Sequence, residues 1–600
     1  MRVRCIRSLR STLLIAVLLL PLAALGAASQ PASDLQARRD ALNKLLAEEW
    51  EYTLSTSPEL ASILGDKRWN DKLSDNSDQA IAADLAKSKE FLTRFEAVDT
   101  TGFPEQEVLN KTLMVRNLRE GIEGHRFKGW LMPVTQISGI HLQIPQFPSF
   151  LSFTTSKDYE DLITRAHGIP RVFDNTIGHM RQGMAAGLMP PKFLLEKVIT
   201  QVEGIAAKKP EESPFAEPLS RFPKDMPEAE KERLRTELLA AIRDDINPSY
   251  VRFAKFLKEE YVPKGRTEVG MWSLPDGDAR YAYRVKASTT TDMTPEQIHQ
   301  IGLREVARIE GEMLGIAKQL GYSDLKSLVA AIEKNPDLHA HSREQILDLY
   351  RQHIDAMYTK LPLLFGRLPK AKVEVLPTEP FREKEASGAE YNQGTPDGSR
   401  PGRVMVNTGD AEKRKIITIE STAYHEGVPG HHLQITIAQE LPTLPPFRQQ
   451  GGYTAFSEGW ALYSERLGKE VGFYQDPYSD YGHLQDEMLR AIRLVVDTGL
   501  HAKHWTRDQV VQFFHDHSGI DEVEVQSETD RYIVWPAQAL AYKVGQMKIL
   551  ELRERARQAL GGKFDIREFH DEVLGAGALP MDVLEARIDA WIAAKKAGAA

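Results

Sequence analysis

The sequence predicts a mainly helical protein with a small β element directly ahead of a segment rich in His and Glu. Apolar residues recur at steps of three and four over long stretches, and short β-type runs are confined to residues 373–407. A group of His and Glu residues follows at 425–465. With 600 residues, 42% of them hydrophobic and 27% charged, the chain is long enough to bury a sizeable core.

The first predicted element is a signal peptide over residues 1–28. Its start, MRVRCIRSLRS, is basic, and TLLIAVLLLPLAALG after it is apolar, with small residues around Ala24, Gly26 and Ala28. These are the features of a cleaved secretory signal. An uncleaved anchor is the alternative, but the apolar run is short for a membrane span. We therefore expect a periplasmic or secreted protein whose residues 29–600 form one helical domain.

Signal removal changes the charge and the cysteine count of the chain. It takes away four arginines and no acid, so the formal net charge moves from −9 to about −13. It also removes Cys5, the only cysteine, which excludes disulfides, thiolate metal sites and a cysteine nucleophile. An acidic chain is a poor partner for nucleic acid. No later stretch reaches ~18 consecutive apolar residues, so we expect no membrane association after processing. The oligomeric state stays open.

Helices are predicted over most of the remaining chain. One apolar face marks a long helix and is formed by Val306, Ile309, Met313, Ile316 and Leu320. This helix begins at Thr294, with Pro295 in the first turn and Gln297 completing a capping box. Further helices are expected over 35–56, 80–97, 105–123, 159–183, 229–259, 341–360, 480–504, 507–517, 538–560 and 579–597. Residues 208–227, rich in Pro and charge, are expected to form an exposed connection.

A small β-sheet is predicted inside an active-site core of about 370–550. Three short runs rich in strand-forming residues, separated by Pro, Gly and Asp, are Val373 to Leu376, Gly388 to Asn392 and Arg403 to Asn407. They end just before the first histidine of the His- and Glu-rich segment. The sheet is therefore expected to lie beside the helix that carries this histidine.

Two motifs, YHEGVPGHHLQ at 424–434 and FSEGWALYSE at 456–465, hold the residue types that a catalytic zinc requires. Zn²⁺ in a hydrolytic site takes three N or O ligands and leaves a fourth position for water, whose pKa it lowers to about 7. In the simplest arrangement, HExxH, two histidines lie one helical turn apart and the Glu is the base. The first motif therefore predicts His425 as a ligand and Glu426 as the general base.

The first motif departs from HExxH, because its next histidines are His431 and His432, at i+6 and i+7 from His425. On a regular helix i+6 points about 240° away and i+7 lies about 10.5 Å along the axis, so neither position suits a second ligand. Pro429 clashes with the carbonyl four residues back and Gly430 accepts unusual dihedrals, which favours a local bulge. A bulge that absorbs two residues returns His431 to the i+4 place. We expect His431 as the second ligand and keep His432 as the alternative ligand or as a hydrogen-bond donor behind the ligands.

These motifs, followed by DTGLH at 497–501 and RYIVWPAQALAYKVG at 531–545, resemble the large bacterial family filed as domain of unknown function 885, whose motif is similar to that of zincin metallopeptidases. GMAAGLMPPK at 183–192 and DGSRPGRVMVNT at 397–408 extend the resemblance to essentially the whole mature chain. It implies a large, mostly helical zincin-like metallohydrolase fold with a central cleft, a small β-sheet next to the metal helix, and hydrolysis of peptides. Ala537 departs from the pattern, because the family usually has Gly there.

The resemblance also suggests the third ligand, and the chemistry of a zinc hydrolase suggests candidates for an oxyanion donor. The SEGWA segment is similar to the third-ligand helix of zincin peptidases, which points to Glu458; Glu465, seven residues on, is the alternative or a carboxylate that holds a ligating His. His501 and Tyr542 are candidates for stabilising an oxyanion, since a protonated His or a Tyr hydroxyl can donate to it. For His501 the alternative is a charge that complements the C-terminus of its helix. For Tyr542 the alternative is an ordinary core position. Arg403 to Asn407 is the candidate strand for pairing with the substrate backbone, or else part of an ordinary hairpin.

The sequence thus predicts a zinc metallopeptidase that binds one Zn²⁺ through His425, His431 and Glu458 and acts on a peptide or small amide substrate. The alternative is a non-catalytic periplasmic binding or scaffolding protein with a structural or degenerate metal site. Glu426 separates the two, because a structural site closed by four ligands has no use for a non-ligand carboxylate beside its first histidine. A serine hydrolase is unsupported, since no GxSxG occurs. Substrate identity, endo or exo preference and zinc against other divalent ions stay open.

Overall fold

The structure is a computed structural model that describes residues 32–598 apart from 381 and 385. The predicted signal peptide, residues 1–28, lies outside the described residues. The described part is mainly helical and contains a three-stranded sheet, which confirms the predicted class. Within this range no helix combines the length and the apolar character that a membrane span requires.

The long helices predicted from periodicity are present in the structure. They are α1 Ala32–Thr56, α3 Asp78–Glu96, α4 Glu105–His125, α6 Ser156–Ala185, α8 Glu228–Ala241, α9 Asn247–Phe256, α11 Pro295–Gln319, α13 Arg343–Tyr358, α19 Pro477–Ala502, α20 Arg507–His517, α22 Leu540–Leu560 and α24 Met581–Lys596. The single helix expected over 229–259 is α8 and α9 joined by a π-turn at Ile242–Ile246. α11 begins at the predicted capping box, where the Thr294 hydroxyl accepts the backbone N–H of Gln297 at 3.2 Å.

The sequence patterns missed several helices. These are α2 Pro58–Ile63, α5 Ile140–Gln146, α7 Lys192–Ala206, α10 Gly277–Thr289, α12 Leu325–Lys334, α14 Leu361–Leu364, α17 Pro446–Gln450, α21 Glu522–Val534 and α23 Ile566–Leu574. The expected exposed connection at 208–227 also differs, because it forms short 3-10 turns and buries Phe215 and Leu219. Both side chains join the core between α6 and α9, which offsets the polar composition of the segment.

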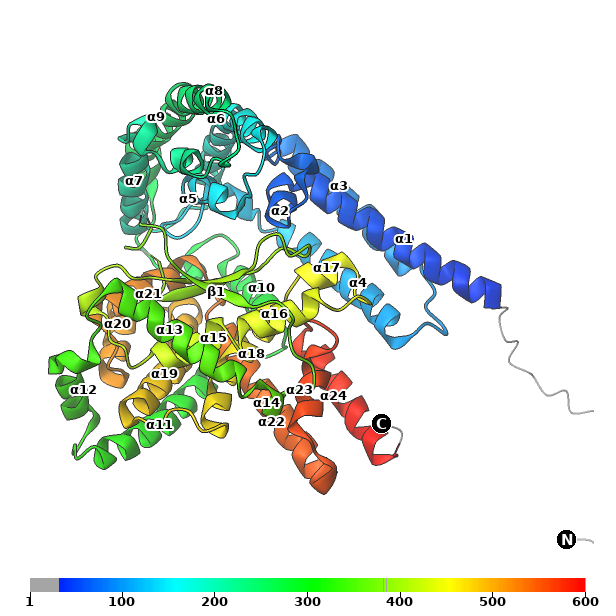
Figure 1. The fold of residues 1–600 in the computed structure, drawn as a ribbon, viewed down its shortest axis with the longest axis vertical. Helices are drawn as coiled ribbons and strands as arrows, with labels where there is room; N and C mark the ends of the chain where they lie inside the picture. Colours follow the sequence, from blue (N-terminus) through cyan, green and yellow to red (C-terminus); the bar gives the residue numbers. More distant parts are fainter. Residues whose placement is uncertain (1–31, 381, 385, 599–600) are drawn as a thin grey trace, which may run out of the picture.

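The helices form two groups (Figure 1). α5 to α9 lie together at one end, around a core that includes Phe173, Tyr250 and Phe253. α11 to α24 and the sheet lie at the other end, where the largest core cluster joins α13, α15, α18 and α22 to α24. α1, α3 and α4 extend along one side. The His- and Glu-rich segment belongs to the second group.

The sheet has the order β1-β3-β2, with β1 Val373–Pro377, β2 Ala389–Asn392 and β3 Gly402–Val406. β3 runs parallel to β1 and antiparallel to β2, so it is the central strand. The expectation that Arg403 to Asn407 pairs with a substrate backbone is therefore wrong, because both hydrogen-bonding edges of β3 are already used. Val404 and Val406 are completely buried, as a central strand requires.

Two helices of the second group approach each other without intervening side chains. α18, Thr454–Glu470, packs against α22 at Gly459 and Gly545. A Cβ atom on Gly545 would lie 1.9 Å from the carbonyl oxygen of Ala455, and one on Gly459 would lie 2.4 Å from the Cα of Gly545. Only glycine permits this approach, which places the side chains of α18 next to those of α22.

We predict that Gly545→Ala destabilises the protein. The added methyl group must push α18 and α22 apart, and overpacking of this kind costs about 1–3 kcal/mol, measurable as a lower urea midpoint. Gly311→Ala in α11 is the matched control, because its Cβ meets nothing within 4 Å. It should stabilise the protein by about 0.5–1 kcal/mol. Equal effects of the two substitutions would contradict the close packing.

Candidate metal centre

His425 lies near the end of α15, Ile419–Glu426, and is 2% exposed. Its Nδ1 is 2.7 Å from a carboxylate oxygen of Glu465. A carboxylate of this kind accepts, so Nδ1 carries a proton and donates, and Nε2 is the nitrogen that faces the other residues of the site. Nε2 lies 3.7 Å from Oε2 of Glu458. His425 therefore presents one available nitrogen to the interior of the site.

A widened turn connects α15 to α16, His431–Gln439. The backbone N–H of Gly430 donates to the carbonyl of Tyr424 at 2.9 Å, six residues back instead of the four of a regular helix. The turn thus absorbs two residues, as the predicted bulge requires. A Cβ on Gly430 would lie 1.9 Å from the carbonyl oxygen of His425, so no other residue fits.

The widened turn brings His431 next to His425. Their rings are 4.8 Å apart and nearly perpendicular, and Nε2 of His431 lies 3.3 Å from Oε2 of Glu458 on α18. One ligand atom from each of the three residues lies within 4.8 Å of the other two. Ligands 2.0–2.1 Å from a tetrahedral ion are about 3.3 Å apart, so these separations fit a single metal ion. His425, His431 and Glu458 could therefore hold a metal.

The charge around these three residues favours a cation. Burial lowers the pKa of His425, but the hydrogen bonds with Glu458 and Glu465 outweigh it and raise that pKa to about 10. Burial raises the pKa of Glu458, but His425 and His431 outweigh it and hold that pKa well below its ordinary value. Oε2 of Glu458 is buried without a well-aligned hydrogen bond from a described residue. A divalent ion would satisfy this oxygen and the surplus of acidic groups.

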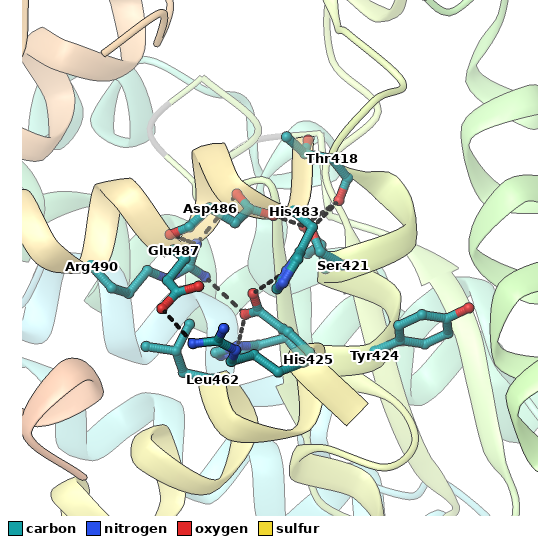
Figure 2. A network of polar contacts seen from close by, with 12 residues as sticks. Thr418, Ser421, Tyr424, His425, Leu462, His483, Asp486, Glu487 and Arg490 are labelled. Atoms are coloured by element: carbon teal, nitrogen blue, oxygen red, sulfur yellow. Dashed lines mark hydrogen bonds and ion pairs between the residues drawn. The ribbon is translucent and has the colours of Figure 1, made fainter. Parts of the chain in front are cut away.

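Glu465 lies behind His425 rather than in the cluster. It is completely buried, and besides the bond to His425 it faces Arg490 at 3.8 Å and His483 at 3.9 Å. Figure 2 shows this network, in which Arg490 also pairs with Asp486 at 3.3 Å. Of the two roles expected for Glu465, the structure favours the carboxylate that orients a ligating histidine.

His432 points away from the cluster. Its Nε2 donates to the carbonyl of Ala371 at 3.0 Å, and its Nδ1 accepts from the hydroxyl of Tyr391 at 3.0 Å. Burial lowers the pKa of His432 to about 4, so the ring is neutral. Both nitrogens are used, and the structure therefore brings together His431 and not the alternative His432.

Glu426 is next to His425 in α15 and is 9% exposed. Its carboxylate makes no hydrogen bond or ion pair with another described residue. Buried carboxylates are normally paired, so a free one beside a ligand set is available for a proton or for substrate.

Tyr542 of α22 lies beside the cluster. Its ring is nearly parallel to that of His425, with centroids 6.2 Å apart. Its hydroxyl oxygen accepts from Arg531 at 3.2 Å and from Gln538 at 3.4 Å, which leaves its own hydrogen to donate. The Gln538 amide also reaches Oε1 of Glu458 at 3.5 Å. Gln538 is not among the site residues predicted from the sequence, although it lies inside the 531–545 motif.

His501 is not brought to the cluster. It is completely buried; its Nδ1 accepts the backbone N–H of Met271 at 3.0 Å, and its Nε2 donates to the carbonyl of Tyr532 at 3.0 Å. Burial lowers the pKa of His501 to about 3, so the ring is neutral. The expected oxyanion role has no support in this geometry, because neither nitrogen is left to donate. The alternative, a charged His501 at the end of its helix, has no support either, because the ring is neutral.

Ala537, which replaces the glycine usual in the resembling family, has a left-handed backbone with φ +67°. Glycine adopts this conformation without steric cost, which accounts for the usual residue. In this chain the N–H of Ala537 donates to both carboxylate oxygens of Asp497, at 3.2 and 2.9 Å. Asp497 thus holds the turn that carries Gln538 toward α22.

Comparison with known proteins identifies the family of this chain and a solved structure similar to it. The model of a family described as bacterial protein of unknown function, DUF885, matches residues 58–588. The crystal structure of a candidate lipoprotein from Colwellia psychrerythraea is 30% identical, with a TM-score of 0.88 over 93% of this chain and 99% of that one. No curated protein matches.

Two further solved structures are more distant. A candidate lipoprotein of unknown function from Shewanella oneidensis is 19% identical, with a TM-score of 0.66 over 92% of this chain and 99% of that one, and so shares the fold. Metallocarboxypeptidase 1 of Trypanosoma cruzi is 12% identical, with a TM-score of 0.31 over 93% of this chain and 96% of that one, which is too low to support an argument.

We predict that His431→Ala abolishes stoichiometric Zn²⁺ binding by the mature protein, because it removes one of three converging ligands. His432→Ala should retain the metal, since the partners of that ring among the described residues are Ala371, Tyr391 and the neighbouring Thr436. Calorimetric titration and metal analysis after dialysis measure the difference. The reverse pattern would transfer the second ligand to His432.

We predict that Glu465→Gln weakens metal binding by about 10–100-fold, because the amide is a poorer acceptor for the Nδ1–H of His425. Competition with a chelator of known affinity measures the change. Glu470→Gln on the same helix is the control, since Glu470 pairs with Arg553 near the surface. Unchanged affinity in Glu465→Gln would show that the bond to His425 does not support the ligand.

Proposed function

This chain belongs to the DUF885 family, and from its own residues we propose that it is a zinc-dependent hydrolase, a metallopeptidase acting on peptides. The observation that carries the proposal is the convergence of His425, His431 and Glu458 beside the unpaired carboxylate of Glu426. The ligand set of two imidazoles and one carboxylate suits zinc. One bound Zn²⁺ would supply a Lewis acid for the substrate carbonyl and an activated water.

Glu426 is the proposed general base. It follows the first ligand in α15, and its carboxylate has no competing partner among the described residues. A carboxylate so placed accepts a proton from the attacking water and returns it to the leaving nitrogen of the cleaved amide. Its partial exposure is consistent with access for water and substrate.

Tyr542 is the proposed oxyanion donor. Arg531 and Gln538 bond to its hydroxyl oxygen, so the hydroxyl hydrogen is directed elsewhere. The guanidinium of Arg493 lies 4.5 Å from its ring centroid and fixes the ring further. A positioned donor stabilises negative charge that develops on a carbonyl oxygen. His501, with both nitrogens used, is left out of this mechanism.

The cluster supports catalysis over the alternative of a binding or scaffolding protein. It has three members among the described residues, whereas structural zinc is usually closed by four ligands. A three-ligand site keeps a position open for substrate. The non-ligand Glu426 would have no purpose in a structural site.

We propose that the protein acts after export, as a periplasmic or secreted domain of residues 29–600. The basic and apolar segments within residues 1–28 support export, as does the likeness to the candidate lipoprotein of Colwellia psychrerythraea. Cys5 precedes the apolar segment, so it cannot become an acylated first residue after cleavage. Export therefore leads to a protein without a lipid on cysteine.

We predict that Glu426→Gln lowers kcat/KM for peptide hydrolysis by about 10²–10⁴-fold or more, because it keeps the shape and removes the base. Substrates come from a peptide library cleaved by the zinc-loaded wild type. Metal content and thermal stability of the variant should stay near those of the wild type, which separates loss of chemistry from loss of the site. Full activity in this variant, or a zinc-loaded wild type that cleaves no peptide, ester or amide, would favour the binding-protein alternative.

A further inference from the structure

A polar pocket of about 480 Å³ adjoins the candidate metal centre. Its walls come from α4, α10, the short helix α17 at Pro446–Gln450, the start of α18 and the turn before α22. Its cationic and aromatic lining side chains are Arg284, Arg448, Tyr283, Phe447, Tyr453 and Trp535. We call it the arginine pocket.

The arginine pocket connects to the metal cluster through two side chains. Thr454 lines the pocket, and Glu458 lies one turn further on the same face of α18, about 6 Å along the axis. Gln538 also lines the pocket, and its amide reaches both Glu458 and the hydroxyl of Tyr542. An extended chain rises ~3.3–3.6 Å per residue, so a substrate bound at the cluster can extend into the pocket within about two residues.

Two guanidinium groups in this pocket have no acidic partner among the residues that the structure describes. Arg284 on α10 is exposed and makes no hydrogen bond or ion pair with another described residue. Arg448 is 3% exposed and bonds to the neutral oxygens of Asn110 and Ala576, while its Nε has no partner among the described residues. Burying a cation without a counter-ion is costly. In a chain of net charge −9 this arrangement indicates that an anion is supplied from outside.

The single carboxylate among the lining side chains does not neutralise the two guanidinium groups. Glu120 on α4 makes no hydrogen bond through its carboxylate to either arginine. Burial raises the pKa of Glu120, which disfavours its charged form. Two further cations near Glu120 are already paired, Arg116 with Asp582 and Lys286 with Asp292. The pocket therefore keeps a positive character.

We propose that the arginine pocket binds a carboxylate of the peptide substrate, with Arg284 as the direct contact and Arg448 as a buried source of positive charge. A guanidinium matches a carboxylate in a bidentate geometry. Trp535, 47% exposed at the same pocket, offers an aromatic surface for the adjoining side chain. This inference rests on the proposed function and names its substrate class: peptides with a carboxylate within about two residues of the cleaved bond. That carboxylate is either the C-terminus or an acidic side chain.

Binding of matched blocked peptides to the mature protein tests the proposal. The probes are acetyl-tetra-alanine as free acid and as amide, and amidated acetyl-Ala-Ala-Ala-Glu and acetyl-Ala-Ala-Ala-Gln. The titrations use metal-free Glu426→Gln protein, because a carboxylate could otherwise bind the metal. We expect at least 10-fold tighter binding of the free acid than its amide, or of the Glu peptide than the Gln peptide. The pair that shows the preference identifies the carboxylate as C-terminal or side-chain.

Substitutions locate the preference. Arg284→Gln should remove it, and Arg284→Lys should retain part of it, because the charge remains without the planar fork. Lys286→Gln on the same helix should leave it unchanged, since Lys286 pairs with Asp292 outside the pocket. Equal binding of carboxylate and amide peptides by the unsubstituted pocket, or an undiminished preference in Arg284→Gln, would overturn the proposal.

Hydrolysis separates this proposal from the proposed function. In the zinc-loaded enzyme, Arg284→Gln should raise KM for the preferred carboxylate peptide about 10-fold with kcat little changed. Hydrolysis of peptides without any preference for a carboxylate would overturn the pocket proposal and leave the metallopeptidase intact. A carboxylate preference in binding without hydrolysis by the zinc-loaded wild type would support the pocket and overturn the enzyme.

Discussion

The site depends on one backbone hydrogen bond, from the N–H of Gly430 to the carbonyl of Tyr424. By spanning six residues it takes two extra residues out of the helix path and places His431 where a regular turn would place the fourth residue after His425. The indole N–H of Trp460 holds the Pro429 carbonyl of the same turn at 2.8 Å. Because Trp460 belongs to α18, the helix that supplies Glu458 also fixes the turn that positions the histidines.

Acidic groups surround this turn, and basic groups lie in the neighbouring arginine pocket. Glu426 and Glu458 lie at or beside the cluster, and Glu465 lies behind His425, where Arg490 moderates its charge. The same helix α18 thus supplies a candidate ligand and, seven residues later, the group that orients another ligand. On the far side of Gln538 the charge is reversed, because the arginine pocket carries guanidinium groups that have no acidic partner within the described part of the chain. A peptide with a carboxylate would meet complementary charge at both ends.

Long helices and short strands could be predicted because their signals are local. The apolar face of α11 and its capping box are both properties of neighbouring residues, and the structure reproduces them. α7 and α10 were missed, and the buried part of 208–227 was expected to be exposed. α10 has a mostly polar composition, and its place is decided by packing against α18 and α22. The consequence is functional, since α10 carries Arg284 and the sequence pattern drew no attention to it.

By itself the sequence determined the helical class, the position of the small sheet, and the segments that carry the candidate cluster, since Pro429 and Gly430 already favour a widened turn between His425 and the next histidines. Only the tertiary structure decided between His431 and His432 and put β3 at the centre of the sheet. It also gave both ring nitrogens of His501 hydrogen-bond partners. These outcomes depend on backbone atoms of distant segments: Ala371 for His432, and Met271 and Tyr532 for His501. A histidine's role follows from the partners of its two ring nitrogens, and residue spacing does not specify partners supplied by other parts of the fold.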